Sequence, residues 1–267
     1  MTARRRALAG LLAVGAVVAA GCAPRPADGA APTEVIVFAA ASLKAPLERA
    51  AATYEVAQPG LAIRLAFESS ATLRTQIEQG APADLFLSAD LANPERVAAA
   101  GLGRGGVTPF AGNTVAIVVP STNPAGIETA FDLARSGVAI VAAGPNVPIT
   151  TYAEQLVERI GALPSAPAEF GAGYERNIVS REDNVRAVVV KLELGEGDAG
   201  IVYRTDATGS TTLRTIPLPD GVTVAVAYGG IVLAGSDRAD DAAAFLAWLV
   251  DDEGQAILAE SGFVPVP

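Results

Sequence analysis

From Thr33 onward, short β-forming runs alternate with segments of helical periodicity, and this alternation restricts the fold more than any other feature of the chain. Apolar residues recur at helical spacing at Leu43, Leu47, Ala51 and Tyr54, for example. The strand-like runs are residues 34–39, 61–67, 83–88, 114–119, 138–142, 200–203 and 223–234. Strands that alternate with helices are typical of α/β proteins with parallel sheets. The sequence therefore predicts an α/β fold.

The N-terminal segment has the features of a bacterial export signal. Three arginines at positions 4–6 precede an apolar run, 7–20, that is shorter than the roughly 20 residues of a membrane span. The run ends in small residues before Cys22, and this motif resembles a bacterial lipobox. We predict a lipoprotein signal peptide at 1–21, lipidation of Cys22 and a flexible tether at 22–32, rich in Pro and Ala. An ordinary secretory signal or an uncleaved anchor would also place the protein outside the cytoplasm.

The residue types that the chain lacks exclude several kinds of site. With one cysteine and no histidine, it can form no internal disulfide, Ser-His-Asp triad or ordinary zinc site. A serine hydrolase built on Ser42 or Ser70 would need a base, and neither Lys44 nor Lys191 belongs to an SxxK motif. We therefore expect a protein that is not an enzyme.

The net charge and the glycine-rich stretches limit which classes of partner and ligand are possible. The net charge of −10 disfavours nucleic acid or an anionic membrane surface, so contact with a membrane would depend on the lipid anchor alone. Small anions remain possible ligands, because backbone dipoles act locally whereas the overall field is screened over about 8–10 Å. The glycine-rich stretches 101–106 and 171–173 lack the context of nucleotide-binding motifs, and we expect them to be loops.

Hydroxyl groups lie at the junctions between predicted strands and helices. Ser42 follows the first strand, and a cluster at 69–72 follows the second. Each hydroxyl could cap its helix or donate to a ligand, because a helix N-terminus offers free N–H groups and a partial positive charge. A third junction at 145–152 contains two prolines, and the segments 182–186 and 200–203 add an Asn cap and a tyrosine. Taken singly, each has a structural explanation.

The order of these segments resembles that of the periplasmic molybdate-binding proteins. The matching segments are FAAASL, SSATL, GAPADLFLSAD, the run from Val147-Pro148 to Tyr152, EDNVR and GIVY, and the resemblance extends from Val35 to the C-terminus. It implies a type II periplasmic-binding-protein fold, with two α/β lobes joined by two crossover strands and a ligand cleft between them. It also implies lobe 1 at 33–115 and 227–267, and lobe 2 at 116–226.

By position, the resemblance implies five oxyanion-binding groups: the hydroxyls of Ser42, Ser70 and Tyr203, and the backbone amides of Ile149 and Val185. No side chain would ligate a metal directly, since the metal arrives inside the oxyanion, and no cofactor is expected. The sequence departs from the family pattern at 149–151, where Ala-Gly is common, and at Ala71, which replaces a frequent serine. A bulkier Ile149 could shrink or reorient the pocket.

The function implied is extracytoplasmic binding of molybdate or tungstate and delivery to the permease subunits of an ABC importer. The protein would act as a monomer on the periplasmic side of the cell membrane, held there by the lipid at Cys22. Two alternatives remain: a binding protein for another tetrahedral oxyanion such as sulfate, and an oxyanion-sensing lipoprotein without a transport role.

Overall fold

The computed structural model describes residues 32–266, so the predicted signal peptide, Cys22 and almost all of the tether lie outside the described residues. The described residues form one compact unit. None of the helices in this part of the chain is long and apolar enough to cross a membrane.

A seven-stranded sheet has the order β2-β1-β3-β9-β4-β7, with β8 also paired to β4. Its strands are β1 (Thr33–Ala40), β2 (Leu61–Glu68), β3 (Leu85–Ser88), β4 (Gly103–Pro120), β7 (Gly200–Tyr203), β8 (Leu213–Ile216) and β9 (Ala225–Leu233). β1 is parallel to β2 and β3, whereas β9 is antiparallel to β3 and β4. A second, parallel sheet contains β5 (Ile140–Ala143) and β6 (Ile178–Glu182). The predicted α/β class is confirmed.

Five helices belong to the ranges predicted for lobe 1. They are α1 (Lys44–Ala57), α2 (Ser70–Glu78), α3 (Ala92–Ala99), α8 (Ala239–Val250) and α9 (Asp252–Glu260). The predicted apolar stripe of α1 is buried, and its Tyr54 ring lies 5.1 Å from the rings of both Phe245 and Trp248 in α8. The aromatic contact therefore joins α1 to α8, two helices far apart in the sequence.

The range predicted for lobe 2 contains the remaining helices. These are α4 (Pro148–Gly161), α5 (Phe170–Arg176), α6 (Val185–Glu193), the four-residue α7 (Arg204–Ala207) and a short 3-10 helix, η2 (Ala130–Ala134). The stripe predicted for α4 is buried, and so is the stripe predicted for α6. The sequence patterns missed α5, β6 and β8, which are short segments with little apolar periodicity.

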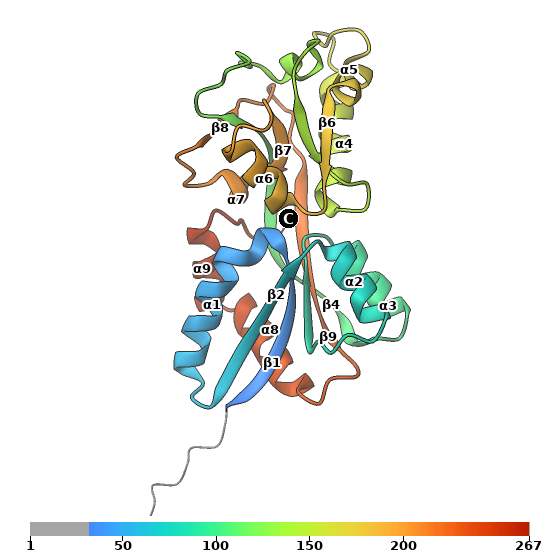
Figure 1. The fold of residues 1–267 in the computed structure, drawn as a ribbon. Helices are drawn as coiled ribbons and strands as arrows, with labels where there is room; N and C mark the ends of the chain where they lie inside the picture. The colour runs from blue at the N-terminus through green and yellow to red at the C-terminus, as the bar shows by residue number, and fades with distance from the viewer. Residues whose placement is uncertain (1–31, 267) are drawn as a thin grey trace, which may run out of the picture. The chain divides into compact units, whose positions relative to one another are not determined.

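Strands β4 and β9 run through both halves of the compact unit (Figure 1). β4 pairs with β9 from Gly103 to Thr114, and from Val115 onward it pairs with β7 and then β8. The runs at 114–119 and 223–234, which are the two predicted crossover strands, lie in β4 and β9 and are side by side where the two halves meet. The lobe boundaries at 115/116 and 226/227 stay predictions, and we keep the names lobe 1 and lobe 2 for those ranges.

The expectation that the glycine-rich stretches are loops holds for residues 101 and 102, which precede β4, and is otherwise wrong. Residues 103–106 belong to β4, and residues 171–173 belong to α5. A Cβ atom on Gly103 would lie 2.3 Å from Ile231 Cδ1, and one on Gly173 would lie 2.8 Å from Ala134 Cβ. Glycine is present at both positions because neighbouring chain segments approach closely, not because the backbone turns there.

The sheet brings the predicted site segments to one edge. Ala40 at the end of β1 is in register with Glu68 at the end of β2, and β3 runs parallel to β1 on its other side. The residues after all three strands therefore emerge together, at the carboxyl edge where open α/β sheets bind ligands. These residues include Ser42, Ser70 and Ala89.

Candidate functional site

A small cavity of about 10 Å³ lies where segments of lobe 1 and lobe 2 meet. Four of the five predicted site residues line it: Ser42 and Ser70 from lobe 1, and Val185 and Tyr203 from lobe 2. The remaining lining residues are Ala40, Ala41, Ser69, Ala89, Val147, Pro148 and Asn184. None of these lining residues, all within the described part of the chain, carries a charge. This volume is far below the roughly 300–1,000 Å³ of pockets that hold drug-sized organic solutes.

The Tyr203 hydroxyl is the most informative group in the cavity. The side chain is 1% exposed, and its oxygen has no hydrogen-bond partner among the described residues. Burial, with smaller contributions from Tyr228 and Tyr152, raises the pKa of Tyr203 well above its ordinary value, so the phenol keeps its proton. A buried hydroxyl without a partner costs about 1–3 kcal/mol, so this position indicates a missing acceptor.

Aromatic packing fixes the direction of the Tyr203 ring. Its centroid lies 5.6 Å from that of Tyr228 and 6.3 Å from that of Tyr152, with interplanar angles of 60° and 63°. Tyr203 is also the last residue of β7 and precedes α7, whose Asp206 carboxylate accepts a hydrogen bond from the Tyr203 amide at 3.3 Å. The hydroxyl is therefore held in place without any hydrogen bond of its own.

The Ser70 hydroxyl is oriented by a backbone amide. Ser70 is the first residue of α2 and is 1% exposed, and its Oγ accepts a hydrogen bond from the Ala89 amide at 3.0 Å. The N-cap of α2 is its neighbour Ser69, whose Oγ accepts from the Thr72 amide at 3.2 Å. Since Ala89 supplies a proton to the Ser70 oxygen, the Ser70 hydroxyl proton is free for another acceptor.

The Ser42 hydroxyl does not cap a helix. Ser42 lies in a one-turn 3-10 helix, η1 (Ala41–Leu43), and neither η1 nor α1 has a side-chain cap. Its Oγ lies 3.0 Å from the Tyr228 hydroxyl oxygen, and the side chain is 8% exposed. Of the two roles that the sequence allowed, cap or outward donor, the structure excludes the cap.

Two helices begin beside the cavity, since their first residues, Pro148 and Val185, line it. Val185 is the first residue of α6, after the N-cap Asn184, whose Oδ1 accepts from the Ala187 amide at 3.0 Å. Ile149 is the second residue of α4, after Pro148. Within the described residues, neither the Val185 nor the Ile149 amide has a hydrogen-bond acceptor. Both are among the unpaired donors that every helix start leaves.

The structure separates the Ile149 side chain from the cavity. Ile149 is 1% exposed and lines a different internal cavity of about 30 Å³ on the lobe 2 side, with Ala153, Tyr174 and Ile201 among its neighbours. Val147 and Pro148 line the cavity between the lobes instead. The larger side chain at position 149 therefore points into the lobe 2 core, and only its amide remains a candidate for ligand binding.

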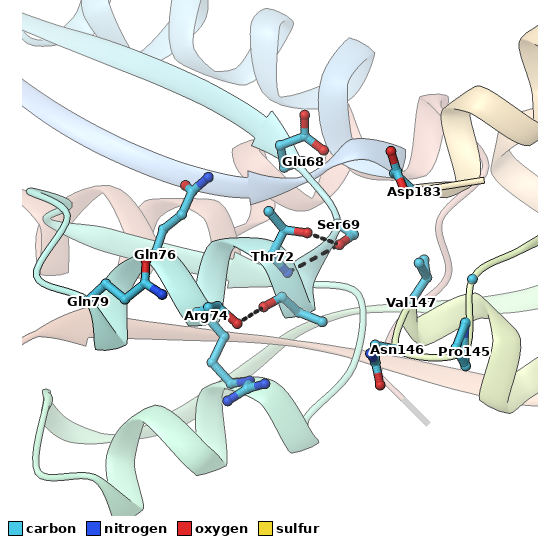
Figure 2. Close-up of a pocket in the computed structure, with 13 residues that line it drawn as sticks. Glu68, Ser69, Thr72, Arg74, Gln76, Gln79, Pro145, Asn146, Val147 and Asp183 are labelled. Atoms are coloured by element: carbon cyan, nitrogen blue, oxygen red, sulfur yellow. Dashed lines mark hydrogen bonds between the residues drawn. The ribbon is translucent and has the colours of Figure 1, made fainter. Parts of the chain in front are cut away.

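A larger groove of about 700 Å³ adjoins the cavity and shares Ser69 and Val147 with it. Figure 2 shows α2 of lobe 1 on one side of this groove and the Pro145–Val147 loop of lobe 2 on the other, with Glu68 and Asp183 near its rim. Asn184 Nδ2 donates to Glu68 Oε2 at 3.3 Å across the two lobes.

Taken together, the cavity offers proton donors and no charged partner. Hydroxyl and amide donors that converge on a site of low polarity bind an anion through its oxygen atoms, as helix N-termini do. No cluster of His, Cys, Asp or Glu suited to a metal ion is found in residues 32–266. An uncharged site of this kind is suited to a small anion.

Sequence reasoning missed two residues that contact these donors and a third that lies behind them. Ala89 supplies an amide to Ser70, Tyr228 contacts Ser42, and Asn113 contacts Tyr228. Asn113 and Tyr228 are 3% and 0% exposed within apolar strands. A polar residue inside such a strand is the one signal that could have drawn attention to them.

Comparison with known proteins gives one family and several relatives. The family described as bacterial extracellular solute-binding protein matches residues 35–264. The molybdate-binding protein ModA of Mycobacterium tuberculosis is 35% identical over 257 residues, which are 96% of this chain and 93% of that protein.

Two solved structures share the fold. The periplasmic molybdate-binding protein of Azotobacter vinelandii has a TM-score of 0.71 at 22% identity and covers 87% of this chain and all of its own. The sulfate-binding protein SubI of M. tuberculosis has a TM-score of 0.76 at 21% identity and covers 88% and 87%. These likenesses confirm the two-lobed type II periplasmic-binding fold expected from the sequence.

Proposed function

Since the chain belongs to the bacterial extracellular solute-binding protein family, we propose that it binds molybdate or tungstate and delivers the anion to an ABC importer. The observation that carries this proposal is the 35% identity to a molybdate-binding protein over nearly the whole chain. The uncharged, donor-lined cavity supports it independently. The likeness to a sulfate-binding protein is one of fold, at lower identity.

Five groups would hold the anion. The hydroxyls of Ser42, Ser70 and Tyr203 and the amides of Ile149 and Val185 each donate one hydrogen bond to an oxyanion oxygen. Hydrogen bonds to a charged acceptor contribute about 1.5–3 kcal/mol each, which supports tight binding after the costs of association are subtracted. No cofactor takes part, because the metal is a component of the ligand.

Selection among oxyanions rests on two properties of the cavity. Donors alone favour an anion without protons, since a protonated oxygen would direct its hydrogen toward another donor. Molybdate and tungstate are both fully deprotonated and larger than sulfate. The separation of the donors across the cleft therefore decides whether the site prefers these two anions or sulfate. Sulfate binding is the alternative within the same fold.

Binding involves no bond making or breaking. The serine hydroxyls lack a histidine base, since the chain contains none, and the buried Tyr203 keeps its proton. Release of the anion follows separation of the lobes, because the donors come from both of them. A ligand that contacts both lobes stabilises the closed form through contacts that the open form lacks.

The family places the protein outside the cytoplasm, and we propose that a lipid at Cys22 holds it at the membrane. Residues 22–32 would act as a tether that lets a monomer reach the permease subunits. The chain passes from lobe 1 to lobe 2 at 115/116 and returns to lobe 1 at 226/227, within or beside the crossover strands.

A sensor lipoprotein would use the same site without a permease. Loss of molybdate uptake on deletion of the gene would distinguish the transporter from such a sensor.

Titration calorimetry on the full chain in detergent tests the ligand. We expect heat from molybdate and tungstate, with sulfate at least about tenfold weaker and phosphate without effect. Heat from sulfate or phosphate alone would overturn the assignment. Titration of each anion into buffer controls for heats of dilution, and Tyr203→Phe protein, which should bind more weakly, shows whether the heat arises at the cavity.

A further inference from the structure

A chain of hydrogen bonds lies behind the Ser42 hydroxyl and runs into both crossover strands. Asn113 is in β4 and Tyr228 is in β9, and both side chains are buried. Asn113 Nδ2 lies 3.4 Å from the Tyr228 hydroxyl oxygen, which lies 3.0 Å from Ser42 Oγ. The three groups therefore form a continuous path from the crossover strands to the wall of the cavity.

The orientation of the Asn113 amide is fixed by its other contacts. Its Oδ1 accepts a hydrogen bond from the Thr114 amide at 2.8 Å, and its Nδ2 donates to Thr205 Oγ1 at 2.9 Å. Exchanging the two ends of the amide would place Nδ2 against the Thr114 N–H, two donors facing each other. The group that faces Tyr228 is therefore the NH₂, which can only donate.

This orientation determines which way the Tyr228 proton points. The Tyr228 oxygen has two hydrogen-bond neighbours in the described part of the chain, Asn113 Nδ2 and Ser42 Oγ. Asn113 Nδ2 cannot accept, so Ser42 Oγ is the acceptor for the phenol proton. Burial raises the pKa of Tyr228 well above its ordinary value, so this proton is retained. Ser42 Oγ therefore accepts from Tyr228, and its own proton is left for the cavity.

We propose that Asn113 and Tyr228 act as positioning residues that hold Ser42 as a hydrogen-bond donor and so make the site selective for fully deprotonated oxyanions. The inference rests on the proposed function and adds a cause of selectivity outside the five groups that touch the anion. The Ser70 oxygen likewise accepts from the Ala89 amide, and the Tyr203 hydroxyl has no acceptor within residues 32–266. All three hydroxyls are thereby donors.

The consequence is discrimination against hydrogen phosphate, which carries a proton at neutral pH. Its P–O–H group needs an acceptor, whereas a Ser42 hydroxyl held by Tyr228 directs its own proton, and not a lone pair, at the ligand. Molybdate, tungstate and sulfate carry no proton and have no such need. Without Tyr228, the Ser42 hydroxyl could rotate and offer a lone pair to the ligand.

A double-mutant cycle on the full chain tests whether Tyr228 acts through Ser42. Molybdate affinity is measured by calorimetry for wild type, Ser42→Ala, Tyr228→Phe and the double variant. We expect Tyr228→Phe to weaken binding about tenfold in wild type and less than about twofold in the Ser42→Ala background. Equal losses of affinity in both backgrounds would overturn only the proposal that Asn113 and Tyr228 act through Ser42, which we call the relay. Absence of molybdate binding by wild type would overturn the proposed function as well.

Phosphate competition gives a readout that a merely structural role would not move. We expect phosphate to compete with molybdate in Tyr228→Phe and not in wild type. Competition in both proteins, or in neither, would overturn the role in selectivity. Tyr54→Phe is the matched control, because it removes a tyrosine hydroxyl from a buried ring of lobe 1 that does not line the cavity.

Asn113→Asp provides a second variant, which keeps the side-chain shape and should reverse the direction of the hydrogen bonds from residue 113 through Tyr228 to Ser42. A carboxylate oxygen in place of Nδ2 would accept the Tyr228 proton, Ser42 would then donate to Tyr228, and a lone pair would face the anion. We expect molybdate binding to weaken more than in Tyr228→Phe. Wild-type affinity in Asn113→Asp, with the protein folded by circular dichroism, would overturn the relay.

Discussion

Asn184 Nδ2 donates a hydrogen bond to Glu68 Oε2 at 3.3 Å, so the residue that caps a lobe 2 helix also contacts the end of a lobe 1 strand. The Oδ1 atom of the same side chain accepts from the Ala187 amide at 3.0 Å. One asparagine thus couples the start of α6, where the Val185 amide is exposed to the cavity, to the closure of the cleft.

Replacing Glu68 by Gln separates its charge from its hydrogen bond. The amide oxygen still accepts from Asn184, but a negative charge at the rim of an anion site is removed. We expect about threefold tighter molybdate binding, mainly through faster association at low salt. Glu68→Ala also removes the hydrogen bond, so molybdate should dissociate faster from Glu68→Ala than from Glu68→Gln. Stopped-flow fluorescence measures both rates, and a Gln variant with slower association would contradict this electrostatic effect.

Tyr203→Phe should change binding and stability in opposite directions. The hydroxyl is buried without a partner in the described residues, so its removal should leave the ligand-free protein unchanged or up to about 1 kcal/mol more stable. Molybdate affinity should fall by about ten- to a hundredfold, as expected for a lost hydrogen bond to an anion. Urea denaturation and calorimetry measure the two quantities. Lower stability with unchanged affinity would show that the hydroxyl has a structural partner instead.

Ser70 and Ser69 are adjacent serines with different expected roles. Ser70→Ala removes a ligand donor and leaves the buried Ala89 amide without an acceptor, so affinity and stability should both fall. Ser69→Ala removes the N-cap of α2 and should cost about 1 kcal/mol of stability with little change in affinity. Calorimetry and thermal unfolding on both variants make each the control for the other. Similar affinity losses would mean that Ser69 also binds the anion.

Ile149→Val tests whether position 149 contributes only its backbone amide. The side chain is 1% exposed and faces the lobe 2 core, so loss of one methylene should cost about 0.5–1.5 kcal/mol of stability. The amide remains in place, and molybdate affinity should change by less than about twofold. A large gain in tungstate or sulfate affinity would instead show that the side chain limits the size of the anion cavity.

The raised pKa of Asp206 leads us to expect that the free energy of unfolding depends on pH. Burial raises the pKa of Asp206 from its ordinary value near 3.8 to about 7, against the opposing effects of the Tyr203 amide and Arg186. The folded state therefore binds this proton more tightly than the unfolded chain does. The associated stability is present below about pH 4 and is lost as the pH rises to about 7.

Asp206→Asn isolates that contribution, because the amide oxygen can still accept from the Tyr203 N–H. The difference in unfolding free energy between the variant and wild type should increase in favour of the variant from pH 4 to 7. Urea denaturation across this range measures it. A difference independent of pH would show that folding leaves the pKa of Asp206 unchanged.

The sequence by itself determined most of the elements and the positions of most proposed donors. The alternation of strands and helices, the hydroxyls at residues 42 and 70, the N-terminus of α6 and the tyrosine at the end of β7 all follow from local patterns. A parallel sheet brings the ends of neighbouring strands to one edge, so those patterns also indicated which segments meet.

Only the tertiary structure decided the direction of each hydrogen bond. Ser42 and Tyr228 are 186 residues apart, and Asn113 and Tyr228 are 115 apart, so no local pattern relates them. The direction of the Ile149 side chain and the contact between Asn184 and Glu68 depend in the same way on packing between distant segments. Local periodicity fixes where a donor lies along the chain, whereas the partners that orient it are set by the folding of the whole unit.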